Sequence, residues 1–157
     1  MMKVHKNWLD STLVNFLYDK FLLHTPHNYG HLSTFDKPPF YNYDFHNDDM
    51  IKYLALKIKN DFFKDEDIQI LRAYINIQHQ GMDGDFHQDD GTTTALYFAC
   101  PTNTNKGFFQ VKNKEDIISI PYVQNQLVIF DAKQFHRGLA FTNFKPRITL
   151  AFKMEKK

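Results

Sequence analysis

The sequence predicts an α+β protein in which N-terminal helices support a β core. Apolar residues recur at helical spacing within residues 1–65, whereas residues 66–154 form short strand-like runs between turn signals. Helices followed by strands are typical of the α+β class. The chain has 157 residues, of which 43% are hydrophobic and 24% charged, so we expect one folded domain over residues 1–157.

Two helices are expected in the first part of the chain. One follows the capping residues Asp10–Thr12 and stops before Pro26, and the other opens after Asn47–Asp49 and runs to about Phe63. The connection between them, His24–His46, is rich in Pro, Asn and aromatic residues and is predicted to be a loop. Its aromatic residues either cover a site as a lid or pack against the helices.

The second part of the chain changes to the period of a β-strand. Residues 67–78 alternate, which places Arg72, Tyr74, Asn76 and Gln78 on one face. Turns separate further strand-like runs over 92–99, 107–111, 117–120, 126–130, 135–141 and 147–154. Many short strands at this spacing are typical of an antiparallel sandwich or barrel.

Composition argues against several classes of protein. A net charge of +1 disfavours binding to nucleic acid by phosphate neutralisation. One cysteine, Cys100, excludes a disulfide framework or a zinc–thiolate cluster within one chain. No apolar run is long enough to span a bilayer, and the N-terminus lacks the pattern of a secretory signal, so we expect no membrane association and a reducing, cytoplasmic location.

A metal site is the first chemical hypothesis, because the chain contains eight histidines. His87 and Asp89 are two residues apart, so on an extended chain both face the same side. His136 is the best candidate for a third ligand. Two imidazoles and one carboxylate on one face of a metal form the facial triad of non-heme iron(II) oxygenases, which leaves positions open for other ligands.

A rival motif with the same pattern is His46-Asn47-Asp48. It lies where a helix is predicted to begin, so Asp48 and Asp49 are better interpreted as N-terminal caps. His87 lies between strand-like segments, where the edge of a sheet presents ligands, and is therefore favoured. The histidines at 24, 27, 31 and 79 and the lysines at 153, 156 and 157 are expected to be solvated.

Arg147 follows His136 by 11 residues, about the length of one strand and a turn. The neighbouring strand can therefore bring its guanidinium close to the metal without coordinating it. The planar cation suits a carboxylate, and Thr149 on the same strand face adds a hydroxyl donor. The alternative is a surface cation after the turn at Pro146.

These motifs occur in a characteristic order along the chain. The matching segments are Arg72-Ala73-Tyr74-Ile75-Asn76, Gly81 and Gly84, His87-Gln88-Asp89, Thr94-Ala95-Leu96-Tyr97-Phe98, Gly107-Phe108-Phe109, Leu127-Val128-Ile129-Phe130-Asp131, His136-Arg137-Gly138 and Arg147-Ile148-Thr149-Leu150. Over about residues 67–154 the chain resembles the iron(II)/2-oxoglutarate-dependent oxygenase superfamily, nearest to its prolyl 4-hydroxylase-like branch. The resemblance implies a double-stranded β-helix, a relative of the jelly roll, with helices packed outside.

The resemblance also implies roles for particular residues. His87, Asp89 and His136 would bind Fe(II). Arg147, with Thr149 assisting, would bind the far carboxylate of 2-oxoglutarate.

Other positions are less fixed by the resemblance. Tyr74 matches a tyrosine that points at the cosubstrate, although a strand aromatic that fills the barrel is an equal alternative. Asn76 and Gln78 share its face and would line the substrate side. Phe98 replaces a tyrosine that is common in relatives, so its contact with the cosubstrate is absent or is taken over by Thr94. Lys106-Gly107-Phe108 replaces the usual Gly-Gly-Glu.

The implied activity is hydroxylation of a peptidyl substrate, prolyl included, or of a small molecule, with O2 as oxidant and decarboxylation of 2-oxoglutarate to succinate. Asp89 favours hydroxylation, because halogenating relatives replace this carboxylate with a small residue. Three alternatives remain open: a nucleic-acid-modifying oxygenase of the same superfamily, a non-catalytic metal-binding jelly-roll module, and a metal-dependent barrel enzyme without a ketoacid cosubstrate.

Overall fold

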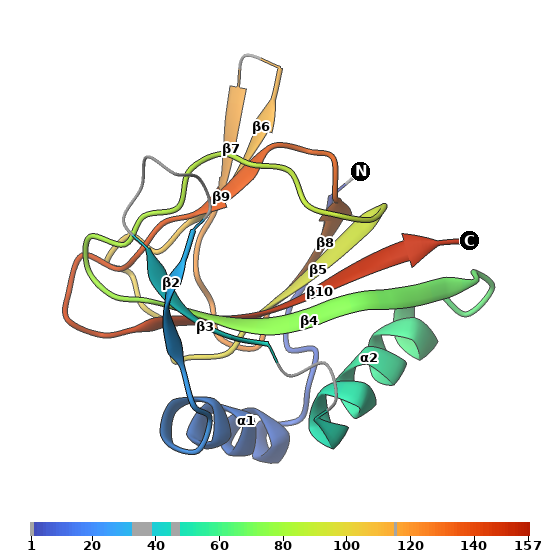
Figure 1. The fold of residues 1–157 in the computed structure, drawn as a ribbon, viewed down its shortest axis with the longest axis horizontal. Coiled ribbons are helices and arrows are strands. Elements are labelled where there is room, and N and C mark those ends of the chain that lie inside the picture. Colours follow the sequence, from blue (N-terminus) through green and yellow to red (C-terminus); the bar gives the residue numbers. More distant parts are fainter. Residues whose placement is uncertain (1, 33–38, 45–47, 115) are drawn as a thin grey trace.

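The computed structural model describes residues 2–32, 39–44, 48–114 and 116–157. Two helices, α1 (Ser11–Leu23) and α2 (Asp49–Phe62), lie below the larger of two sheets in Figure 1. The larger sheet has seven strands in the order β1-β8-β5-β10-β4-β3-β2, and the smaller has three in the order β7-β6-β9. The strands are β1 (Lys3–His5), β2 (Asn28–His31), β3 (Phe40–Asp44), β4 (Ile68–Gln78), β5 (Thr93–Phe98), β6 (Phe109–Asn113), β7 (Asp116–Ile120), β8 (Leu127–Asp131), β9 (His136–Gly138) and β10 (Arg147–Lys156).

All of the paired strands run antiparallel. The arrangement confirms the predicted α+β class and agrees with a double-stranded β-helix core. Neither helix in the described part of the chain is long and apolar enough to cross a membrane.

Both helices begin where the sequence predicts, because an aspartate caps each one. The Asp10 carboxylate accepts a hydrogen bond from the Leu13 amide at 3.0 Å, and the Asp48 carboxylate accepts one from the Met50 amide at 2.9 Å. This confirms that Asp48 caps a helix. His46, the rival ligand, lies outside the described residues, as do Phe35 and Phe45 of the aromatic connection between the two helices.

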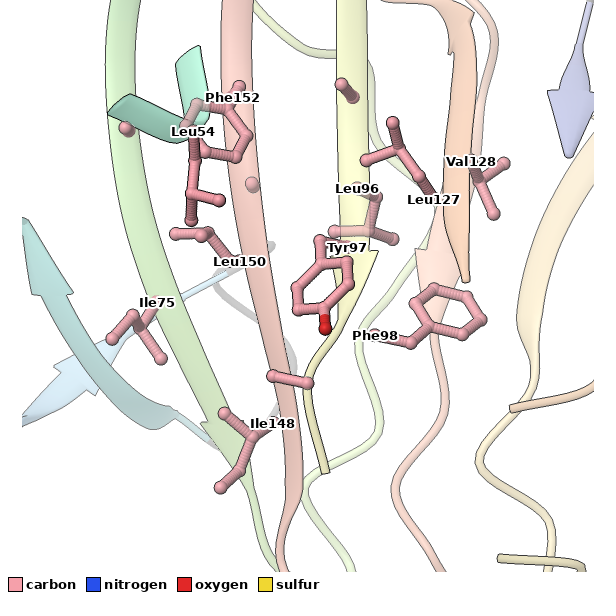
Figure 2. Close-up of a cluster of buried hydrophobic side chains, with 14 of the residues drawn as sticks. Leu54, Ile75, Leu96, Tyr97, Phe98, Leu127, Val128, Ile148, Leu150 and Phe152 are labelled. Carbon is pink, nitrogen blue, oxygen red and sulfur yellow. The ribbon is translucent and has the colours of Figure 1, made fainter. Parts of the chain in front are cut away.

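The hydrophobic core lies between the helices and one face of the larger sheet. Figure 2 shows Leu54 of α2 beside Leu150 and Phe152 of β10, and all three are fully buried. Truncation of a buried leucine such as Leu54 to Ala costs about 2–5 kcal/mol. Because side chains alternate along a strand, the residues between these apolar positions face the opposite side of the sheet.

That opposite face carries the polar residues of β4 and β10. The register pairs Arg147 with Gln78, Thr149 with Asn76, Ala151 with Tyr74 and Lys153 with Arg72. Directly opposed residues of an antiparallel pair point to the same side, so these eight residues form one surface.

The predicted loop between the helices is partly wrong, because it contains two strands. β2 and β3 pair with each other, and β3 pairs with β4 through Tyr41 opposite Ile77 and Asn42 opposite Asn76. A third unpredicted strand, β1, pairs with β8 at the other edge of the sheet. The region before residue 66 therefore extends the sheet as well as supplying helices.

Candidate active site

A cavity of about 240 Å³ opens on the polar face of β4 and β10. Every site residue that the sequence predicts lines it: Tyr74, Asn76, Gln78, His87, Asp89, His136, Arg147 and Thr149. β4 and β10 of the larger sheet supply five of these residues, β9 of the smaller sheet supplies His136, and the segment before β5 supplies His87 and Asp89. The cavity thus collects groups that are up to about half the chain apart in the sequence.

Three potential metal ligands meet in this cavity. Ligand atoms of His87, Asp89 and His136 all lie within 4.8 Å of one another. The Nε2 atoms of His87 and His136 lie 3.6 Å and 3.3 Å from the two Asp89 oxygens. Metals such as zinc bind these ligand types at about 2.0–2.2 Å, so ligands of one ion are at most about 4.4 Å apart, and both pairs satisfy this limit.

Backbone pairing brings the two histidines together. The amide of each donates to the carbonyl of the other at 3.0 Å, in an isolated antiparallel bridge between the segment before β5 and strand β9. Each ring is also oriented by its own chain. The Nδ1 atoms of His87 and His136 lie 2.8 Å from the carbonyl oxygens of Asp85 and Gln134. Because a carbonyl only accepts, Nδ1 of each ring carries a proton, and Nε2 is the ring atom that faces Asp89.

The charge states suit a divalent cation. Burial, followed by the charge of His136, lowers the pKa of His87, so its ring is neutral at pH 7. Burial by itself would raise the pKa of Asp89, but contacts with His136 and Lys153 hold it well below its usual range. Two imidazole nitrogens and one carboxylate oxygen are the donor set of non-heme iron(II) sites.

Asp89 is also held in place by neighbours that are not ligands. The Thr94 hydroxyl of β5 donates to Asp89 Oδ2 at 2.7 Å, and the Lys153 ammonium contacts Oδ1. Outer contacts of this kind fix a ligating carboxylate. The structure thus places Thr94 against a potential metal ligand.

Arg147 lies at another part of the cavity and is only 2% exposed. Its Nη1 donates to Gln78 Oε1 at 2.7 Å and its Nε to the Gly107 carbonyl at 3.1 Å. Both of these acceptors are uncharged. Nη2 is buried and has no partner among the described residues. Burial lowers the pKa of Arg147, but a guanidinium stays charged in proteins.

A buried cation with an unused donor fits a ligand carboxylate, because burial of an unpaired charge is costly. Thr149, 1% exposed, lies one step further along the same face of β10. The rings of Tyr122 and Phe98 lie 5.4 Å and 5.8 Å from the guanidinium carbon. Phe98 therefore contributes an aromatic wall where relatives are expected to have a hydroxyl.

The other predicted residues have contacts that the sequence did not indicate. Gln78 positions Arg147 and donates from Nε2 to the carbonyls of Met82 and Gly138 at 2.8 Å and 3.1 Å. Asn76 Oδ1 accepts from Asn42 at 3.1 Å. Burial, followed by the charge of Asp89, raises the pKa of Tyr74, so its phenol stays protonated.

Lys153 is a cavity residue that the sequence did not indicate. It was expected in a solvated tail, but it is 2% exposed and pairs with Asp89. The signal was present: Arg147, Thr149 and Lys153 occupy alternate positions of one strand and so share a face. His31 was also expected in solvent, but it lines the cavity with its ring 5.8 Å from that of Tyr74.

No protein-family model and no curated protein matches this sequence. Solved structures match over nearly the whole chain. An oxidoreductase of the 2OG-Fe(II) oxygenase family from Burkholderia pseudomallei has a TM-score of 0.79 at 12% identity, over 98% of this chain and 84% of that one. The fold of this chain is that of a 2-oxoglutarate oxygenase.

Two further structures share this fold. A prolyl hydroxylase from Trichoplax adhaerens, in complex with a peptide fragment of hypoxia inducible factor, has a TM-score of 0.76 at 15% identity, over 97% of this chain and 83% of that one. HygX from Streptomyces hygroscopicus, with nickel, 2-oxoglutarate and hygromycin B bound, has a TM-score of 0.77 at 9% identity, over 98% of this chain and 82% of that one. The likeness confirms the double-stranded β-helix.

Proposed function

We propose that this protein is an iron(II)- and 2-oxoglutarate-dependent dioxygenase that hydroxylates its substrate. One observation carries the proposal: a single cavity holds the His87, Asp89 and His136 cluster together with a buried Arg147 whose Nη2 lacks a partner. Iron(II), when bound by the three ligands, would supply oxygen activation coupled to decarboxylation of 2-oxoglutarate to succinate. The chain itself supplies binding, orientation and exclusion of water.

Arg147 would bind the far carboxylate of 2-oxoglutarate through Nη2, and the Thr149 hydroxyl would donate a second hydrogen bond. Gln78 and the Gly107 carbonyl hold the guanidinium in place, since they accept from its other nitrogens. The buried rings of Phe98 and Tyr122 keep water from this end. Tyr74, whose phenol stays protonated, is available to donate toward the cosubstrate.

The substrate is proposed to be peptidyl, prolyl included, or a small molecule. Two structures with this fold support these two classes, since one is a prolyl hydroxylase with a peptide and the other has hygromycin B bound. The carboxylate of Asp89 favours hydroxylation over halogenation. The net charge of +1 disfavours nucleic acid as substrate, and the single cysteine suits a cytoplasmic location.

The test is iron-dependent formation of succinate from 2-oxoglutarate. We expect turnover with Fe(II) and O2, and its loss in His87→Ala. His24→Ala is the matched control, since His24 is exposed at the end of α1. Undiminished turnover in His87→Ala would contradict the ligand assignment. Metal and 2-oxoglutarate binding without succinate formation, across peptide and small-molecule panels, would favour the non-catalytic module.

A further inference from the structure

A pair of cations lines the cavity at the end opposite Arg147. Lys153 of β10 and Arg72 of β4 are register partners, and both line the cavity. From Arg147 to Lys153 the strand rises by about 20 Å, at about 3.3 Å per residue. The Tyr74 ring lies beside both cations, 5.0 Å from the Arg72 guanidinium carbon and 5.4 Å from the Lys153 ammonium.

Like charges directly opposite each other in a sheet are destabilising, so these two cations require a counter-charge. Lys153 pairs with Asp89, and Arg72 Nη2 lies 4.0 Å from the exposed carboxylate of Asp90. Arg72 Nε is buried and has no acceptor among the residues that the structure describes. In the metal-free protein two carboxylates thus balance the two cations, but Arg72 keeps an unused buried donor.

Metal binding would take away part of this compensation. Under the proposed function, Asp89 would coordinate iron(II). Its negative charge would then be shared between the metal and Lys153. The charges of iron(II) and Arg147 balance those of Asp89 and the two carboxylates of 2-oxoglutarate. Lys153 and Arg72 are then left with Asp90 alone, an excess of one positive charge.

His31 completes this end of the cavity without adding a charge. Burial, followed by the nearby charges of Arg72 and Lys153, lowers the pKa of His31. Its neutral ring can exchange hydrogen bonds with a bound group. The cavity end thus offers two cations, one neutral imidazole and the aromatic wall of Tyr74.

We propose that the substrate carries an oxyanion, a carboxylate or a phosphate, which Lys153 and Arg72 bind beside the metal. The inference rests on the proposed function and specifies its substrate class. The cavity of about 240 Å³ also contains the proposed 2-oxoglutarate site, so the oxyanion is assigned to the part of the cavity that Lys153 and Arg72 line.

The test measures anion binding to protein loaded with Zn(II) and saturating 2-oxoglutarate, which cannot turn over. Propionate, inorganic phosphate and neutral propionamide are titrated while the 15N shift of Arg72 Nε is followed. We expect a saturable shift with propionate or phosphate and none with propionamide. The anion that binds with the higher affinity shows whether the substrate carries a carboxylate or a phosphate.

Variants assign the binding to Lys153. Lys153→Met should weaken binding of the anion about tenfold, since a hydrogen bond to a charged group is lost, and Lys153→Arg should largely restore it. Lys156→Met is the matched control, because Lys156 lies on the same strand but pairs with Glu66 at the surface. If Lys153→Met does not fold, Arg72→Gln, at a partly exposed position, serves in its place.

The inference would be overturned if propionamide bound as tightly as propionate, or if Lys153→Met bound the anion with wild-type affinity. It would also be overturned if Lys153→Met lost affinity for 2-oxoglutarate while its affinity for the anion stayed intact. The last would make Lys153 a cosubstrate residue and leave the proposed function standing. Failure of 2-oxoglutarate to bind the metal-loaded wild type would overturn the proposed function itself.

Discussion

Arg147 and Lys153 are both buried cations on one face of β10, but their partners differ in kind. Arg147 is held by the neutral acceptors Gln78 and Gly107 and keeps an unused donor. Lys153 is held by the carboxylate of Asp89. A buried charge is tolerated when it is paired. Under the proposed function, Arg147 would gain its counter-charge from 2-oxoglutarate, whereas Lys153 has one already and would lose part of it when Asp89 binds metal.

The largest expected effect comes from breaking the pair at the Lys153 end. Asp89→Asn preserves volume but leaves Lys153 buried without a counter-charge. Loss of one partner of a buried pair costs about 3–5 kcal/mol. For a chain of this size each kcal/mol lowers Tm by about 2–4 °C. We expect thermal unfolding of the metal-free protein to show a correspondingly lower Tm, and metal affinity to fall about 100-fold or more, since a ligand is removed.

The double variant Asp89→Asn/Lys153→Met separates the two effects. It should recover most of the lost stability, since no unpaired charge remains, but none of the metal affinity. A double variant as unstable as Asp89→Asn would show that the Asp89 side chain stabilises the fold through contacts other than Lys153, such as Thr94.

At the other end, Arg147→Met should affect the cosubstrate and leave the metal in place. Loss of hydrogen bonds to a charged carboxylate costs about 2–3 kcal/mol, which corresponds to about 30- to 150-fold weaker binding of 2-oxoglutarate. Calorimetry on protein loaded with Ni(II) measures this affinity. Because no protein carboxylate pairs with Arg147 in the described structure, we expect a smaller loss of stability than in Asp89→Asn. Equal destabilisation by the two variants would contradict the contrast between the two cations.

The same contrast explains what the sequence could predict. Arg147 was predicted because its distance from His136 and its place after a turn are visible in the sequence. Lys153 was missed because a lysine near a chain end is usually solvated, and only the alternation of β10 places it inside. The β2–β3 hairpin was missed because its strands are short and derive their stability from pairing with β4, a long-range contact that local periodicity does not contain. The hydrogen bond from Gln78 of β4 to the Gly138 carbonyl of β9 likewise depends on a contact between the two sheets, which local periodicity does not contain.

A smaller change at the Arg147 end is Gly138→Ala. A Cβ at Gly138 would lie 2.9 Å from Arg147 Nη1 and 3.1 Å from Gln78 Oε1, so the guanidinium must shift. Overpacking of this kind costs about 1–3 kcal/mol. We expect 2-oxoglutarate affinity to fall by about tenfold, less than in Arg147→Met. Metal affinity, measured by competition with a chelator, should stay at the wild-type value. A parallel loss of metal affinity would mean that the two parts of the cavity are not independent.

The smallest expected effect is that of Lys153→Met on the pKa of His87, because the charge of Lys153 contributes to the lowering of this pKa. Burial is the main cause of its lowered pKa, and the charges of His136 and Lys153 add to it. A lowered pKa means that the folded protein binds the proton less readily than the unfolded chain. The neutral ring therefore contributes stability that is present above about pH 6.5 and is lost as the pH falls through the pKa of the folded state.

Lys153→Met should raise the pKa of His87 only slightly, because one of several causes is removed while burial, the largest cause, remains. The shift of the His87 ring proton in NMR, followed between pH 5 and 8 on metal-free protein, measures it. Lys156→Met should leave the titration unchanged, since its ammonium lies at the surface beside Glu66. An unchanged midpoint in Lys153→Met would show that the charge of Lys153 is already neutralised by Asp89. The excess positive charge at this end of the cavity would then arise only after Asp89 has bound a metal.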